Sequence, residues 1–169
     1  MLTTNFYNYV MTNMTGCPIP NGFTTYMGEK RNTYAFPSAS PFANIGMLKT
    51  VMDEDTFGVT IGTGTKAPAV EDFNLEAPLV SGFKVVNPGE GSMSSEEDCV
   101  KWTATYAITN TGAEPIRISE IGLFAEGYSG QSAAIRTLYD RTVLEEPIVI
   151  DPGHCKHITY TICFQYPVA

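Results

Sequence analysis

The stretch VKWTATYAITNTGAEPIRISEIGLFA, from Val100 to Ala125, carries the clearest structural pattern in the chain. In its first half, large apolar residues alternate with smaller or polar ones, the period of two expected for a β-strand with one buried face. A polar run around Gly112 predicts a turn, after which a second strand returns from Ile116. We therefore predict a β-hairpin with Trp102, the only tryptophan, as an anchor of the core.

The return strand changes phase partway along. Ile116 and Ile118 have one parity, whereas Ile121 and Leu123 have the other. An alternation that slips by one residue is typical of a β-bulge, which we expect at Glu120.

Shorter alternating runs elsewhere indicate more strands, and the glycine, proline and aspartate residues between them predict turns. At least six strands with almost no helix predict an all-β protein, a β-sandwich of immunoglobulin-like or jelly-roll topology over residues 46–169. A helical turn over 69–75 and a flexible polar loop over 87–98 are the exceptions. The further strands are expected at 57–61, 79–86, 138–144, 147–150 and 157–166.

Residues 1–45 form a distinct N-terminal part, in which helical apolar spacing over 3–14 predicts a short amphipathic helix that ends at Gly16. An irregular arm follows, with a short hairpin near 24–36. Such a short helix must dock, either on its own domain or as an anchoring arm on a neighbouring subunit. The candidate assembly contacts of this part are Phe6, Tyr9, Val10, Phe23, Tyr26, Tyr34, Phe36 and Phe42.

Composition excludes several classes of partner. The chain has 169 residues, a net charge of −8 and 17% charged residues. Nucleic acids and anionic membranes attract clustered lysine and arginine, so neither is an expected partner. Residues 1–16 lack the features of a secretory signal and no apolar run reaches the length of a membrane span, so we expect synthesis in a cytoplasm.

Motifs that bind phosphate or catalyse acyl transfer are incomplete. The sequence GTGTK, residues 62–66, lacks the spacing of a phosphate-binding loop, and Pro68 interrupts the helix that should follow. No nucleophile elbow accompanies the two histidines, so a hydrolase has no supporting constellation. We expect no catalytic residues and no cofactor.

Metal sites are also weakly indicated. His154, Cys155, His157 and Cys163 contain good ligand types, but a straight strand separates Cys163 from the others. The acidic clusters 53–55 and 96–98 lack the spacing of an EF-hand loop. We therefore expect no metal site at any of these places.

Three arginines lie in otherwise apolar strand neighbourhoods, and we expect them to pair with nearby carboxylates rather than to bind a ligand. The arginines are Arg117, Arg136 and Arg141, and the carboxylates are those of Glu114, Glu120 and Asp140.

Four phrases together resemble small structural proteins of tailed bacteriophages. They are NFYNYVMTNMTG (5–16), FGVTIGTGTKAPAVEDFNLEAPL (57–79), YAITNTGAEPIRISEIGLFAEG (106–127) and RTVLEEPIVIDPG (141–153). The resemblance implies a non-enzymatic virion protein of the tail, neck or capsid decoration. It further implies a homo-oligomer that contacts other virion proteins.

A different function remains open beside this one. A receptor-binding or carbohydrate-binding module at a phage tail tip would use exposed aromatic side chains against a host-surface glycan. The candidates for this role are Tyr26, Tyr34 and Tyr128.

Overall fold

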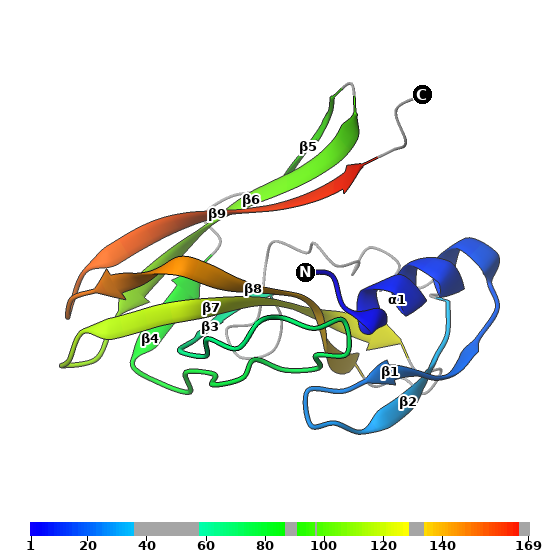
Figure 1. The fold of residues 1–169 in the computed structure, drawn as a ribbon, viewed down its shortest axis with the longest axis horizontal. Helices are drawn as coiled ribbons and strands as arrows, with labels where there is room; N and C mark the ends of the chain where they lie inside the picture. The colour runs from blue at the N-terminus through cyan, green and yellow to red at the C-terminus, as the bar shows by residue number, and fades with distance from the viewer. Residues whose placement is uncertain (36–57, 87–90, 97, 129–133, 166–169) are drawn as a thin grey trace.

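The computed structural model describes residues 1–35, 58–86, 91–96, 98–128 and 134–165. It confirms an all-β protein whose antiparallel sheets form a sandwich, with one short N-terminal helix (Figure 1). The elements, in chain order, are α1 (Thr4–Thr15), β1 (Ile19–Thr24), β2 (Lys30–Thr33), β3 (Gly58–Gly62), β4 (Phe83–Val86), β5 (Ser92–Ser95), β6 (Cys99–Asn110), β7 (Ile116–Tyr128), β8 (Ala134–Ile150) and β9 (Cys155–Gln165).

The sandwich has two sheets. In the first, β7 lies between β3 and β8. In the second, β9 pairs along nearly the whole of β6, while β4 and β5 share the opposite edge of β6. In Figure 1 these sheets form two layers that lie close together at one end and diverge toward the other.

The predicted hairpin of residues 100–125 is wrong, because β6 and β7 belong to different sheets. Residues 111–115 carry the chain from β6 in the second sheet to β7 in the first. Residues 151–154 carry it back, from β8 in the first sheet to β9 in the second. Asn110 holds the two crossings together. Its buried side chain donates to the Ile150 carbonyl at 2.9 Å, and its backbone N–H donates to the His154 carbonyl at 2.9 Å.

The space between the sheets is filled as the alternation predicts. Trp102, Ala104, Tyr106 and Ile108 of β6 are buried and contact residues of the facing strands. The other core residues are Val59, Ile61, Ile118, Ile121, Leu123, Ile150, Tyr160 and Ile162. Burial of this apolar surface is the main stabilising contribution to the fold.

The phase slip at Glu120 is confirmed. The pairing of β7 with β8 changes register between Ile118 and Glu120, and a second change near Leu123 leaves Tyr139 as an extra residue on β8. Because of the first change, Ile118 and Ile121 both face the core while Glu120 faces outward.

The outer face of the first sheet is covered by the segment between β3 and β4. Leu75 of this segment packs on Phe124 of β7 and Leu138 of β8, and all three side chains are buried. In place of the helical turn predicted over 69–75, this segment has one hydrogen-bonded turn, in which the Asp72 N–H donates to the Ala69 carbonyl at 3.1 Å, followed by irregular chain without helix. Its covering role has no signal in the sequence pattern, and it creates the environment in which Glu120 is buried.

Strand lengths differ in part from the predictions. A single strand, β8, replaces the two runs expected between 138 and 150. The fourth strand is shorter than the predicted 79–86, and β5 lies within the stretch expected to be a loop. All four residues of β5 are exposed, so no hydrophobic alternation marks this strand.

The N-terminal helix is confirmed and docks on its own domain. Gly16 ends α1 in the left-handed conformation, at φ 69°, and its N–H donates to the Thr12 carbonyl. Residues 1–3 pair with β8, where the Thr3 N–H donates to the Tyr139 carbonyl at 2.9 Å. The short hairpin expected near 24–36 is formed by β1 and β2.

Candidate interaction surface

The N-terminal module, defined here as α1, β1 and β2, is anchored by polar side chains. Asn5 mimics a strand partner: its Nδ2 donates to the Thr24 carbonyl at 2.8 Å, and the Thr24 N–H donates to its Oδ1 at 2.7 Å. The Thr3 hydroxyl donates to the Leu138 carbonyl at 2.6 Å, and Asn8 donates to the Gly22 carbonyl at 2.6 Å. These bonds fix the rotation of the helix about its axis.

Aromatic contacts complete the docking. The Phe6 ring stacks on Phe164 of β9 at 5.5 Å and makes an edge contact with Tyr139 of β8 at 6.1 Å. Since Phe6 contacts both sheets, α1 occupies the end of the sandwich at which the two layers diverge (Figure 1). Phe23 of β1 is fully buried in the same cluster.

The docked helix turns apolar side chains toward solvent. Tyr7, Met11 and Met14 are 51%, 52% and 77% exposed. Their spacing of four and three residues places them along one face, which we call the outer stripe. Asn5 and Thr12, by contrast, are buried. Phe6 is buried as well, so this helix has apolar side chains on two faces, whereas a usual surface helix has them only on the face turned to the core.

A second exposed apolar group lies at the turn between β1 and β2. Tyr26 is 40% exposed and Met27 is 70% exposed. Phe73, from the segment that covers the first sheet, is 41% exposed and lies beside Gly28, at which a Cβ atom would be 3.5 Å from the Phe73 ring. The exposed apolar surface of the module thus extends beyond the helix.

The predicted assembly contacts fall into several environments. Phe6 and Phe23 are buried inside the chain and serve its own core, while Tyr9 and Val10 pack against that cluster. Tyr34 is partly buried. Tyr26 keeps the exposure that such a contact needs, whereas Phe36 and Phe42 lie outside the described residues.

Sequence reasoning missed Tyr7 and Met11 as surface candidates. Their spacing with Met14 was visible, but helical periodicity alone does not show which of two apolar faces is buried. The decisive signal was the polar pair Asn5 and Asn8, whose hydrogen bonds to β1 turn the opposite face outward.

The GTGTK loop binds carboxylates of its own chain. The Gly64 N–H donates to Glu120 at 3.1 Å, and the Thr65 and Lys66 N–H groups donate to Glu76 at 2.8 and 2.7 Å. The hydrogen bond from the Lys66 N–H has the largest effect on the Glu76 carboxyl, and it lowers the pKa of that group below its usual value. These amides are thus occupied, in agreement with the prediction of a plain loop.

Arg141 pairs with two carboxylates beside this loop, those of Glu120 and Asp72. Its Nε donates to Glu120 and its Nη1 to Asp72, each at 2.8 Å, and its Nη2 donates to the Lys66 carbonyl at 3.1 Å. Burial lowers the pKa of Arg141, but the bonds to Asp72 and Glu120 outweigh that effect and the pKa is raised overall. The expected pairing of Arg141 with Glu120 is confirmed, and it is an internal structural contact.

The fold does not bring together the histidine and cysteine side chains that were considered as metal ligands. Along β9, Cys155 and His157 lie opposite Thr109 and Ala107 of β6, whereas Cys163 lies opposite Lys101 at the far end. Among the described residues, one group of mixed ligands is close together, formed by Glu96, Asp98 and Cys99, whose ligand atoms lie within 4.8 Å of one another. Lys101 already forms an ion pair with Glu96 in this group. The cluster 53–55 lies outside the described residues.

Comparison with known proteins gave no relative: no family model, no curated protein and no solved structure matches this chain. Within the part of the chain that the structure describes, no helix has the length and apolar character required to cross a membrane.

Proposed function

We propose that this protein is a non-enzymatic structural component of a tailed-bacteriophage virion. In this proposal it assembles with copies of itself and with neighbouring virion proteins. The observation that carries the proposal is the outer stripe, in which Tyr7, Met11 and Met14 face solvent although the opposite face of the helix already buries Phe6 in the chain's own core. The sequence resemblance supplies the virion context. Exposed apolar groups that lie together are characteristic of surfaces that bind another protein.

The mechanism is adhesion by a pre-formed surface. Hydrogen bonds of Thr3, Asn5 and Asn8 hold the helix in one orientation before any partner arrives. The outer stripe then loses no further backbone freedom on binding, so more of the free energy of burying its side chains contributes to affinity. The sandwich acts as the rigid support.

The test compares two methionine substitutions. The double variant Met11→Lys/Met14→Lys places charges in the outer stripe, and Met93→Lys places one at a methionine of β5 whose exposure lies between those of Met11 and Met14. Light scattering after gel filtration would report self-association, and peptide mass spectrometry of purified particles would report incorporation. We expect the stripe variant to lose both and the Met93 variant to keep both. Normal assembly of the stripe variant would refute the adhesive role, and absence of the wild-type chain from particles would refute the virion assignment.

A further inference from the structure

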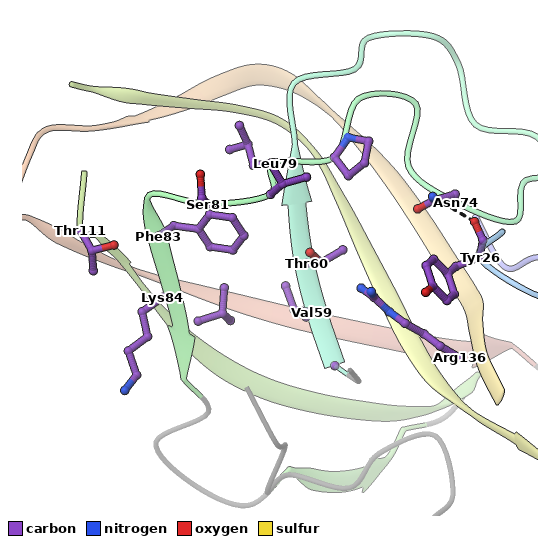
Figure 2. Close-up of a pocket in the computed structure, with 14 residues that line it drawn as sticks. Tyr26, Val59, Thr60, Asn74, Leu79, Ser81, Phe83, Lys84, Thr111 and Arg136 are labelled. Atoms are coloured by element: carbon purple, nitrogen blue, oxygen red, sulfur yellow. Dashed lines mark hydrogen bonds between the residues drawn. The ribbon is translucent and has the colours of Figure 1, made fainter. Parts of the chain in front are cut away.

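A groove of about 620 Å³ runs between an edge of each sheet (Figure 2). β3 forms one wall, and β4 with the segment leading into it forms the other. Arg136 of β8 and Tyr26 of the hairpin lie at one end, as Figure 2 shows. The groove lies apart from the outer stripe, which consists of helix residues only.

Arg136 is the unusual residue of this groove. Its guanidinium group lies 4.2 Å from the centre of the Phe124 ring and 5.2 Å from that of Tyr26. The Tyr26 N–H donates to the Arg136 carbonyl at 3.2 Å, which holds the Tyr26 ring beside the guanidinium. Two aromatic rings therefore position this cation, and ring contacts leave the N–H edge of a guanidinium free to donate.

Within the described residues, Arg136 makes no ion pair with a carboxylate, and its buried Nε has no hydrogen-bond partner. The expected pairing of this arginine with a carboxylate is therefore not seen, in contrast to Arg141. Burial lowers the pKa of Arg136, which reflects the cost of removing the cation from water. A partly buried cation without an anion is unfavourable, and a bound carboxylate would relieve that cost through paired N–H···O bonds.

The remaining groove surface offers both apolar and polar groups of the kind that bind a sugar ring. Phe83 and Tyr26 supply apolar faces, and aromatic faces pack well on the C–H side of a sugar. Thr60, Ser81 and Asn74 supply hydroxyl and amide groups for hydrogen bonds with sugar hydroxyls. The Asn74 side chain is itself fixed by a bond from Nδ2 to the Tyr26 carbonyl at 3.2 Å, drawn in Figure 2.

We propose that this groove binds a carboxylate-bearing saccharide, such as a uronic or sialic acid residue of a surface glycan. Arg136 holds the carboxylate, and the rings of Tyr26 and Phe83 pack against the sugar. This site is independent of the proposed assembly role, since its lining excludes the outer stripe. Either proposal can fail without the other.

The experiment uses the full chain and isothermal titration with three probes: sodium glucuronate, N-acetylneuraminic acid and the neutral methyl glucoside. We expect one or both acids to bind and the neutral sugar to bind at least tenfold more weakly. Arg136→Gln is expected to weaken binding of the acid at least tenfold. Arg117→Gln, which removes an exposed arginine of β7 away from the groove, is the matched control and should bind as the wild type does.

A second measurement guards against misfolding of the Arg136 variant. Amide chemical shifts of the wild-type chain, titrated with the acid that binds, should move at Thr60, Ser81 and Val85 of the groove. Equal binding of neutral and acidic sugars, an Arg136→Gln variant that binds as tightly as the control, shifts confined to residues outside the groove, or no binding of any probe would each overturn the proposal.

Discussion

Arg141 Nε lies 2.8 Å from Glu120 Oε2, and both side chains are almost completely removed from solvent. The pair lies on the outer face of the first sheet, beneath the segment that joins β3 to β4. Each partner also reaches into that segment: Glu120 accepts from the Ala77 N–H at 2.7 Å, and Arg141 donates to Asp72. The ion pair therefore joins the covering segment to the sheet.

Removal of one charge from this pair should destabilise the fold strongly. Glu120→Gln leaves the Arg141 guanidinium buried beside a neutral amide, and breaking a buried pair costs about 3–5 kcal/mol. We expect a loss of that size in the free energy of unfolding, measured by urea denaturation. Asp72 still binds Arg141 in the variant, which places the expected value toward the lower end of that range.

The matched control is the exposed pair of Glu29 and Arg31, whose side chains are 55% and 54% exposed. Pairs of this kind contribute about 0–1 kcal/mol, so Glu29→Gln should change stability little. Similar losses for Glu29→Gln and Glu120→Gln would contradict the assigned role of the buried pair.

The sequence predicted the strands well and their connection badly. Alternation in Val100–Ile108 shows which side chains are buried, and this part was correct. However, a hairpin and a crossing between sheets have the same alternation and the same polar turn. The deciding contact is that of Asn110 with Ile150, forty positions away, which no local pattern reveals.

The candidate surfaces also depend on contacts between residues that are far apart in the sequence. The amphipathic spacing of α1 predicted a docked helix, but the orientation depends on hydrogen bonds of Asn5 with Thr24 of β1, nineteen residues later in the chain. The groove around Arg136 depends on Tyr26 and Phe83, which come from distant parts of the chain. Residue type indicated that Tyr26 could matter, but nothing in the sequence indicated Phe83, and only the tertiary structure brings the two to one groove.

Acid should loosen the covering segment through Glu76. The amide N–H groups of Lys66 and Thr65 stabilise its carboxylate, so its pKa in the folded protein lies below the usual 4.5. A lowered pKa contributes stability that is complete above pH 4.5 and is lost as the pH falls through the folded value. When the pH is lowered from neutral to below 4.5, the Glu76→Gln variant should therefore lose less of its free energy of unfolding than the wild type does, as measured by urea unfolding. An acid-induced loss of the same size in both proteins would exclude this contribution.

Alkaline pH should destabilise the core through buried tyrosines. Burial raises the pKa of Tyr106 from 10.0 to about 12. Above pH 10 the unfolded chain loses this proton while the folded chain keeps it, so stability falls as the pH rises from 10 toward 12. A shift of this size corresponds to roughly 2–3 kcal/mol at the most alkaline pH.

The test is Tyr106→Phe, which removes the phenol and keeps the ring in the core. We expect a smaller loss of stability above pH 10 than in the wild type, measured by chemical denaturation at successive pH values. Tyr7→Phe changes an exposed tyrosine of α1 and serves as the control. If both variants lost stability in step with the wild type, Tyr106 would not be the source of the alkaline effect.

The two faces of α1 should respond oppositely to mutation. Phe6 is 1% exposed and contacts both sheets, so Phe6→Ala should cost about 3–5 kcal/mol of stability through the cavity it leaves. Met11→Lys changes a side chain that is 52% exposed, and a surface substitution of this kind usually alters stability by less than about 0.5 kcal/mol. Thermal unfolding of the isolated chain measures both. A large loss in Met11→Lys would mean that the outer stripe already packs inside the folded chain, and it would then be unavailable to a partner. Full stability combined with lost self-association would show that this face is maintained for assembly, because its apolar side chains would contribute nothing to folding.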